Sequence, residues 1–300
     1  MIPCMVAPTA PARVLGIIGD PVAHSLSPRM YTAAFEAAGI PWRYLAFRVL
    51  PTDLADAVRG IRALGLAGVN VTIPHKETVI AFLDGLETSA RRIGAVNTIR
   101  VEDGHLIGYN TDAPGLLEAL SRAGGAAVAG AQCLILGAGG AGRSAAFAVA
   151  GAGARSVTIL NRTPSRAQEV MVRLAEAHPA CAVAAGPLDA TTVVHAAEDA
   201  AVVIQATSAT LSAAMGGGGG RAAWLEALEP ALRPGMMVLD MVYTPRRTEL
   251  LAAAAAAGAI VVDGVSMLVH QGARSFELWT GHPAPVAAMR RALDAVERAL

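Results

Sequence analysis

The sequence predicts an α/β fold with parallel sheets, arranged as two domains. Short apolar segments alternate with amphipathic or alanine-rich helical segments along the whole chain, a pattern typical of helices packed on parallel strands. The length of 300 residues suits about two domains. One apolar segment also leads through a glycine-rich turn into a helix at residues 132–143, the local order with which α/β proteins bind nucleotides.

In the first third of the chain, apolar runs and turn residues set the expected elements. Strands are expected at residues 14–19, 42–49 and 68–73, and helices at 28–38 and 51–64. Ser27 is expected to cap the first helix, and Pro28 suits the first helical position. Residues 94–101 and 105–109 are expected to form a hairpin around residues 102–104.

The alternation of strands and helices repeats further along the chain. A helix over residues 111–123 leads into the glycine- and alanine-rich segment 124–130, which we expect to be a hinge. Strands are then expected near residues 132–136, 156–160, 182–185, 202–206, 237–240 and 260–263. Two helices, 265–280 and 283–300, follow and are expected to pack on the first domain. The five glycines at 216–220 predict a flexible surface loop.

These elements predict one discontinuous domain and one continuous domain. Residues 1–112 and 265–300 would form the first, and residues 113–264 would form the second. Because the second carries the glycine-rich turn, we expect it to be a Rossmann domain.

The composition argues against several classes of partner. Basic and acidic residues number 24 each, so the charge does not indicate nucleic acid or membrane partners. Mean hydropathy is +0.46, yet no apolar run reaches the roughly 18 residues typical of a membrane helix. Three widely spaced cysteines and an N-terminus without a basic start predict a cytoplasmic protein with reduced thiols. The histidines and cysteines of the chain lack metal-ligand spacing, so no metal is expected. The protein is expected to be a monomer or a homodimer.

The glycine-rich turn predicts a dinucleotide site. Gly137, Gly139 and Gly142 satisfy the G-x-G-x-x-G pattern between a strand and a helix. Glycines let the backbone approach a pyrophosphate, and the helix N-terminus offers unpaired amides to it. The alternative is an ordinary tight turn in a chain rich in glycine and alanine.

The end of the next strand favours NADP over NAD. An NAD site usually has a carboxylate there for the ribose 2′-hydroxyl, but this chain has Asn161, Arg162 and Thr163, followed by Arg166. Two guanidinium groups suit an anionic 2′-phosphate. The alternative is a solvated helix start with two surface arginines.

Lys76 is the only lysine in the chain, and arginine supplies the other 23 basic residues. Guanidinium stays charged in proteins, whereas a lysine amine can pass a proton. A lysine kept against such a bias is therefore a candidate for acid–base chemistry, although it could also be a leftover surface residue.

Other polar residues suggest a ligand site less specifically. Ser25 and Ser27 could clamp a small carboxylate at a helix start, or could simply cap the helix. Asn97 and Asp112 stand at expected strand ends or helix starts, where caps and turns explain most polar residues.

Six motifs in order give the chain a close resemblance to the shikimate dehydrogenase family. The resemblance covers nearly the whole chain from about residue 14. The motifs are residues 19–28 (GDPVAHSLSP), 70–77 (NVTIPHKE), 94–98 (GAVNT), 109–112 (YNTD), 137–142 (GAGGAG) with 161–163 (NRT), and 263–271 (DGVSMLVHQ).

The resemblance implies an NADP-dependent enzyme that reversibly reduces 3-dehydroshikimate to shikimate in a cleft between the domains. Lys76 would be the acid–base group, paired with Asp112. The implied substrate-binding residues are Ser25, Ser27, Thr72, Asn97, Tyr243 and Gln271, with Asp112 also on a ring hydroxyl. The implied cofactor-binding residues are Gly137, Ala138, Gly139, Gly140, Ala141, Asn161, Arg162, Thr163, Arg166, Thr207, Gly264 and Met267.

The chain departs from the family pattern at a few positions. Gln205 stands where the family usually has asparagine, Thr210 where it usually has glycine, and Tyr31 and Thr32 replace histidine and asparagine. The alternatives are an NAD-preferring quinate/shikimate dehydrogenase, a paralogue acting on an amino-shikimate, and a non-catalytic shikimate or quinate sensor.

Overall fold

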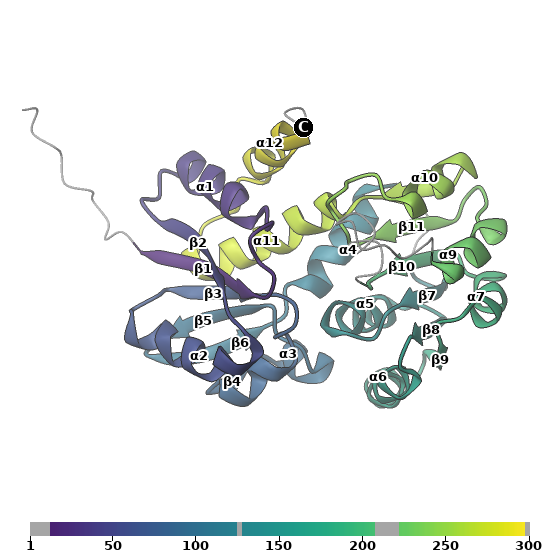
Figure 1. Cartoon of the computed structure of the whole chain (residues 1–300), viewed down its shortest axis with the longest axis horizontal. Coiled ribbons are helices and arrows are strands. Elements are labelled where there is room, and N and C mark those ends of the chain that lie inside the picture. Colours follow the sequence, from purple (N-terminus) through teal and green to yellow (C-terminus); the bar gives the residue numbers. More distant parts are fainter. Residues whose placement is uncertain (1–12, 125–127, 208–221, 298–300) are drawn as a thin grey trace, which may run out of the picture. The chain divides into compact units, whose positions relative to one another are not determined.

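The computed structural model describes residues 13–124, 128–207 and 222–297. They form two compact units, each with a six-stranded sheet (Figure 1). The first unit contains the described residues up to Glu87, Val96–Tyr109 and those from Gly272 onward, and the second contains Thr88–Ala95 and Asn110–Gln271. Thr210, the five-glycine segment and part of the expected hinge lie outside the described residues.

The first unit has a mixed sheet with strand order β2-β1-β3-β5-β6-β4. Only β5 runs antiparallel to its two neighbours, because a tight hairpin joins it to β6. Helix α1 lies against β1 and β2, and α12 lies against α1. The elements are β1 (Val14–Gly19), α1 (Ser27–Ala38), β2 (Arg43–Arg48), η1 (Pro51–Asp53), α2 (Leu54–Ala63), β3 (Gly68–Val71), η2 (Thr78–Phe82), β4 (Gly85–Leu86), β5 (Thr98–Glu102), β6 (His105–Tyr109) and α12 (Val286–Glu297).

The second unit has a fully parallel sheet with strand order β12-β11-β10-β7-β8-β9. This is the doubly wound order of a Rossmann fold, whose strand order reverses beside its first strand, β7. The elements are α3 (Thr88–Ile93), α4 (Asp112–Arg122), β7 (Gln132–Leu136), α5 (Gly140–Gly151), β8 (Ser156–Asn161), α6 (Pro164–Ala177), β9 (Ala182–Pro187), α7 (Ala190–Ala197), β10 (Val202–Gln205), α9 (Ala223–Leu228), η3 (Glu229–Ala231), β11 (Met237–Asp240), α10 (Glu249–Ala256), β12 (Ile260–Val262) and the first part of α11 (Gly264–Thr280).

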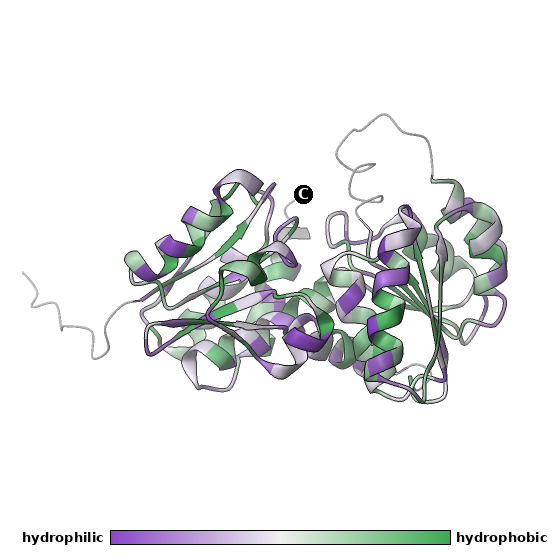
Figure 2. Cartoon of the chain, turned by 90° about the horizontal axis from the view of Figure 1, so that it is seen from below, coloured by the Kyte–Doolittle hydropathy of each residue, from purple (hydrophilic) through white to green (hydrophobic). Residues whose placement is uncertain are grey.

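Both faces of the second sheet are buried, which explains its continuous apolar strands. Cys133 and Ile135 of β7 belong to the core on one face, and Leu134 and Leu136 belong to the core on the other. Successive strand residues point to opposite faces, so a strand covered on both sides has no polar alternation. Figure 2 shows these apolar strands between helices that carry their hydrophilic residues on the outside.

The structure confirms the predicted α/β fold and most predicted elements, with several corrections. Ser27 is wrong as a helix cap: it is the first residue of α1, and its amide donates to the Ser25 hydroxyl at 3.3 Å. The helix expected at 51–64 begins with a separate 3₁₀ turn, η1. The sequence reading missed α3 and the two-residue strand β4 because both are too short for a periodic pattern.

Among the described residues, no helix has the length and apolar character needed to span a membrane. In the same ranges, no group of three or more His, Cys, Asp or Glu side chains could hold a metal ion.

Candidate functional site

The first unit carries five of the expected site residues on segments that adjoin one edge of its sheet. Strands β1, β3 and β6 run in the same direction and end at this edge, while β5 starts there. Carboxyl ends of parallel strands are where α/β proteins place ligand-binding groups. The segments with the expected residues follow or precede these strand ends in the sequence: Ser25 and Ser27 after β1, Thr72 and Lys76 after β3, and Asn97 just before β5.

The two serines are held by a short hydrogen-bonded turn. The amide of Ser25 donates to the carbonyl of Val22 at 3.0 Å, and the Ser25 hydroxyl accepts from the amide of Ser27. Ser25 is half-buried and Ser27 is only 3% exposed. Because the Ser25 oxygen accepts this bond, its own proton can be directed to an anionic ligand.

The turn between Thr72 and Lys76 is fixed by packing and by a buried histidine. A Cβ atom on Gly19 would lie 2.3 Å from the Thr72 methyl group, so only glycine fits beneath Thr72. His75 is 1% exposed, and its Nε2 lies 2.7 Å from the carbonyl oxygen of Val49. His75 therefore anchors the turn to the end of β2, which is a structural role.

Backbone hydrogen bonds join the Lys76 turn to the segment that carries Asn97. The amide of Val96 donates to the carbonyl of Lys76 at 2.7 Å, and the amide of Val71 donates to the carbonyl of Asn97 at 2.8 Å. The amide of Asn97 donates in turn to the carbonyl of Tyr109 at 3.1 Å. The half-buried Lys76 and the buried Asn97 thus stand on backbone segments that are directly bonded to each other.

A buried polar network beneath Asn97 was not visible in the sequence. The Tyr44 hydroxyl donates to the side-chain oxygen of Asn70 at 2.6 Å, which makes the Asn70 amide nitrogen the donor. That nitrogen shares its two protons among three acceptors at 3.0–3.2 Å: the backbone oxygen of Asn97 and the Thr98 and Ser275 hydroxyls. The Thr98 hydroxyl then donates to the Asn97 side-chain oxygen at 3.2 Å. The network therefore fixes the orientation of the Asn97 amide.

Of the two departures at residues 31 and 32, Tyr31 packs against this network through Tyr44. Tyr31 is fully buried; its hydroxyl donates to the Gly272 carbonyl at 3.0 Å, and its ring stacks on that of Tyr44 at 4.3 Å. Burial raises its pKa beyond the range of ordinary tyrosines. Thr32 is exposed on α1. Tyr31 is therefore a core residue of the first unit.

In the second unit, Asp112 and Gln271 lie on two closely packed helices. Asp112 is the first residue of α4 and is 3% exposed, and Gln271 of α11 is 8% exposed. A Cβ atom on Gly115 would lie 2.5 Å from the backbone nitrogen of Gln271, so glycine is needed for the two helices to approach this closely. Asp112 thus stands at the N-terminus of α4, beside the packed segment of α11.

Glycine suits the three positions of the nucleotide motif for different structural reasons. Gly137 has a φ of +114°, and a Cβ on Gly142 would lie 2.0 Å from the oxygen of Gly137, so both are required by the turn itself. A Cβ on Gly139 would meet no atom within 4 Å, and Gly139 precedes the first helical residue of α5, Gly140. The missing Cβ of Gly139 therefore leaves room for a ligand at the helix N-terminus, which fits a pyrophosphate.

Asn161 ties this turn to the end of β8. Its side-chain oxygen accepts from the amide of Ala138 at 3.1 Å, and its amide donates to the carbonyl of Thr163 at 2.9 Å. Arg162 and Arg166 are both exposed beside the start of α6, whose first turn contains no acidic residue. The end of β8 thus presents guanidinium groups in the place where NAD sites have a carboxylate.

A second buried network connects the segments of Thr207 and Tyr243. Gln205 and Asp240 are neighbours across β10 and β11, both are 0% exposed, and their side chains are 3.4 Å apart. The Gln205 side chain bonds both the amide and the carbonyl of Thr207. Asp240 accepts from the amide of Val242 at 2.9 Å. Gln205, which departs from the family pattern, therefore links the Thr207 segment through Asp240 to the segment that leads to Tyr243.

Burial gives Asp240 an unusual carboxyl group. Removal from water raises the pKa of Asp240 to about 6, although bonds from the Val242 amide and the Thr248 hydroxyl act in the opposite direction. The Thr248 hydroxyl donates at 2.8 Å and also caps α10. Asp240 and Thr248 were not among the expected site residues.

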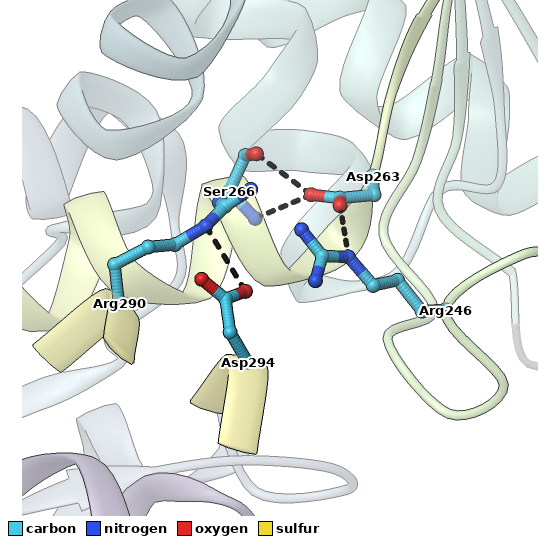
Figure 3. A network of polar contacts seen from close by, with 5 residues as sticks. All are labelled: Arg246, Asp263, Ser266, Arg290 and Asp294. Carbon is cyan, nitrogen blue, oxygen red and sulfur yellow. Dashed lines mark hydrogen bonds and ion pairs between the residues drawn. The ribbon is translucent and has the colours of Figure 1, made fainter. Parts of the chain in front are cut away.

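Asp263 organises the start of α11 (Figure 3). Figure 3 also draws the Arg290–Asp294 ion pair of α12. Asp263 accepts from the amide and the hydroxyl of Ser266 at 2.8 and 2.7 Å, and it accepts from Arg246. These bonds lower the pKa of Asp263 despite its burial. This cap fixes the first turn of α11.

Gly264 and Met267, two expected cofactor residues, lie in this same first turn of α11. A Cβ on Gly264 would lie 2.5 Å from the carbonyl oxygen of Val242, so α11 starts in direct contact with the segment that leads to Tyr243. The expected cofactor residues thus all lie in the second unit, whereas the expected substrate residues are divided between the two units.

Three family models match successive parts of the chain. The family model described as the shikimate dehydrogenase substrate binding domain matches residues 17–99. The shikimate/quinate 5-dehydrogenase model matches residues 119–216, and the shikimate 5′-dehydrogenase C-terminal domain model matches residues 264–293. A shikimate dehydrogenase (NADP(+)) from Moorella thermoacetica is 45% identical over 294 residues, which cover 96% of this chain and 95% of that protein. The chain belongs to the shikimate dehydrogenase family.

Solved structures related to this family member carry different ligands. A Thermus thermophilus shikimate 5-dehydrogenase in complex with NADP(H) and shikimate has a TM-score of 0.79 and 36% identity, covering 96% of this chain and 100% of that one. A Corynebacterium glutamicum quinate dehydrogenase in complex with NAD has a TM-score of 0.82 and 29% identity, covering 95% and 99%. The predicted resemblance to the shikimate dehydrogenase family is confirmed.

Proposed function

We propose that the protein is an NADP-dependent shikimate dehydrogenase, which reversibly reduces 3-dehydroshikimate to shikimate. One observation carries the substrate assignment: the only lysine of the chain stands on a turn bonded directly to the Asn97 segment, at a sheet edge shared with Ser25, Ser27 and Thr72. The Moorella relative is named a shikimate dehydrogenase (NADP(+)), and the Thermus structure is a complex with NADP(H) and shikimate.

The polar residues match a small acid with several hydroxyl groups. In this proposal Ser25 and Ser27 bind the carboxylate, and Thr72 and Asn97 bind ring hydroxyls. Asp112, Gln271 and Tyr243 complete the substrate contacts. Such a pocket rejects analogues that lack a hydroxyl, because its own buried polar groups would then be left without partners.

Lys76 supplies the proton in the proposed reduction. Transfer of a hydride to a ketone creates an alkoxide, which a donor within hydrogen-bond reach must protonate. Lys76 can donate this proton and hold positive charge beside the oxygen. In shikimate oxidation the same amine removes the proton from the hydroxyl.

Asp112 is proposed to orient Lys76 and to bind a neighbouring hydroxyl. Asp112 follows Tyr109 by three residues, which limits their Cα separation to about 11 Å, and Tyr109 is bonded to Asn97 beside the Lys76 turn.

The second unit is proposed to hold NADP. When bound, the nicotinamide supplies or accepts the hydride. Gly139 and the start of α5 fit the pyrophosphate, with Gly137, Ala138, Gly140 and Ala141 forming the rest of the turn. Asn161, Arg162, Thr163 and Arg166 are proposed to bind the adenosine ribose and its 2′-phosphate. Thr207, Gly264 and Met267 are proposed to lie near the nicotinamide.

The alternative activities are less well supported. An NAD-preferring quinate enzyme should favour a carboxylate at the end of β8, where this chain has two exposed arginines. Assays with an amino-shikimate as substrate would distinguish a paralogue that acts on that compound. A non-catalytic sensor would have no need for the lone lysine or for Asp112. We also propose that the protein works in the cytoplasm as a monomer or homodimer, with Cys133 and Cys181 as free thiols.

Steady-state assays of the purified protein test the proposal. Shikimate, quinate and an amino-shikimate should each be offered with NADP and with NAD, and cofactor reduction should be followed by absorbance. We expect the highest kcat/KM for shikimate with NADP. A higher kcat/KM with NAD would overturn the cofactor assignment, and oxidation of quinate in preference to shikimate would overturn the substrate assignment.

A further inference from the structure

Asn110 belongs to the motif at residues 109–112, but it has no assigned role in the proposed reaction. It is 5% exposed and lies two residues before Asp112. Its side-chain oxygen accepts from the amide of Ala113 at 3.1 Å. Asn110 therefore closes the first turn of α4, the turn that begins with Asp112.

The two amide protons of Asn110 go to other segments of the second unit. One bond reaches the carbonyl of Ala95 at 2.9 Å, and the other reaches the hydroxyl of Ser144 at 2.8 Å. The Ser144 hydroxyl donates in turn to the carbonyl of Gly140 at 2.8 Å. Gly140 is the first residue of α5 and belongs to the nucleotide motif.

These bonds allow only one arrangement of donors and acceptors. If the Asn110 amide were reversed, its oxygen would face the oxygen of Ala95, and its nitrogen would face the donating amide of Ala113. The Ser144 hydroxyl has one proton, which goes to Gly140 because Asn110 supplies a proton from its other side. Ser144 is 0% exposed, so water cannot replace a lost partner without rearrangement.

We propose that Asn110 and Ser144 are positioning residues, which form a hydrogen-bonded connection between the start of α4 at Asp112 and the nucleotide turn at Gly140. This inference rests on the proposed function of Asp112 and of the glycine turn. The connection would hold the proton-handling carboxylate and the pyrophosphate-binding amides in one fixed geometry. Small displacements of such groups reduce turnover strongly.

Ser144→Ala tests the connection, because it removes the middle link and leaves the bonds of Asn110 to Ala113 and Ala95 in place. We expect kcat for shikimate oxidation to fall roughly tenfold and the Kd for NADP, measured by calorimetry on the full-length protein, to rise roughly fivefold. Ser144→Thr keeps a hydroxyl that can bond the carbonyl four residues earlier, and it should recover most of both losses.

Thr280→Ala is the matched control. Thr280 makes the same kind of bond, from a helical hydroxyl to the carbonyl four residues earlier, at 2.8 Å to Phe276, and it has no assigned role in the site. We expect its kcat and NADP affinity to stay within about twofold of wild type, even if its Tm falls as for any lost hydrogen bond.

A second variant, Asn110→Asp, keeps an acceptor for Ala113 but removes both donors. Its effect should exceed that of Ser144→Ala, and combining the two should cost much less than the sum of their separate effects, because both break one connection. If Asn110→Asp does not fold, Ser144→Ala still decides the question.

The outcomes separate this inference from the proposed function. If the wild-type protein does not oxidise shikimate, the proposed function fails, and NADP calorimetry on Ser144→Ala still reports on the nucleotide side of the connection. If wild type is active and Ser144→Ala changes only Tm, with kcat and the NADP Kd unchanged, the connection is merely structural and the inference is wrong.

Discussion

The Thr98 hydroxyl donates a hydrogen bond of 3.2 Å to the side-chain oxygen of Asn97. Thr98 can act as this donor because Asn70 donates to its oxygen at 3.0 Å and the Ser275 hydroxyl, 2.8 Å away, can supply the proton of the bond between the two hydroxyls. The orientation of a proposed substrate-binding amide is thus set from inside the protein, by residues that are themselves buried. Buried networks of this kind fix geometry only when every member is satisfied.

Thr98→Val is expected to loosen Asn97 while preserving the shape of the side chain. The KM for shikimate should rise roughly tenfold, as expected for losing one buried hydrogen bond, while the KM for NADP stays unchanged. Steady-state kinetics with each substrate varied in turn would measure both. Thr98→Ser should restore the wild-type KM; if it does not, or if the valine variant binds shikimate normally, Thr98 does not orient Asn97.

Gly139→Ala is expected to lower NADP affinity, whereas Gly142→Ala is expected to impair folding. At Gly139 a methyl group meets no protein atom within 4 Å and the φ of −78° suits alanine, so stability should be unchanged while NADP affinity drops at least roughly tenfold. At Gly142 the methyl group would collide with the backbone of Gly137, so folding itself should suffer. Thermal denaturation and NADP calorimetry distinguish the two. Equal NADP affinity in Gly139→Ala and wild type would contradict the placement of the pyrophosphate.

Arg162→Ala should weaken NADP binding selectively. The variant loses a guanidinium that can pair with the 2′-phosphate, so kcat/KM for NADP should fall roughly tenfold or more, and kcat/KM for NAD should change little. Arg155→Ala, which removes a surface-facing arginine at the opposite end of β8, serves as the control. Parallel losses with both cofactors would argue against a 2′-phosphate contact.

Asp240 should make stability depend on pH in the opposite sense to most carboxylates. Its pKa is raised from 3.8 to about 6 in the folded protein, so folding favours the protonated form. The stabilisation is full below pH 4 and is lost as the pH rises through 6, by an amount of about 3 kcal/mol.

Urea denaturation of wild type and Asp240→Asn between pH 4 and 7 measures this effect. The asparagine variant keeps an acceptor for the Val242 amide but cannot ionise. Its free energy of unfolding relative to wild type should therefore increase with pH over this range. A difference that is independent of pH would show that Asp240 titrates normally in the folded state.

The sequence was sufficient for elements with strong local signals. Strands β1, β7 and β11 have the predicted bounds, because each is an apolar run closed by glycine or a polar residue. The glycine turn was also readable, since strand, turn and helix are contiguous. The start of α1 was misjudged by one residue, because either serine of the Ser25–Ser27 pair can accept an amide proton.

The supporting residues could not be predicted, because their partners are distant in the sequence. Asn70 and Ser275 are 205 positions apart, and Gln205 meets Asp240 only through the register of β10 and β11. A single sequence shows neither pairing. Gln205 therefore looked like a departure from the family pattern, whereas the structure gives it a defined role under Thr207.

The most direct test of the account is the behaviour of Lys76→Ala with shikimate and NADP. We predict that turnover falls by at least about a thousandfold while the shikimate Kd, measured by calorimetry, stays within about tenfold, since the amine acts mainly in the transition state. Lys76→Arg should be as inactive, because guanidinium retains the charge but cannot pass a proton. Shikimate oxidation by Lys76→Ala at a rate close to that of wild type would contradict the assignment of the proton transfer to Lys76.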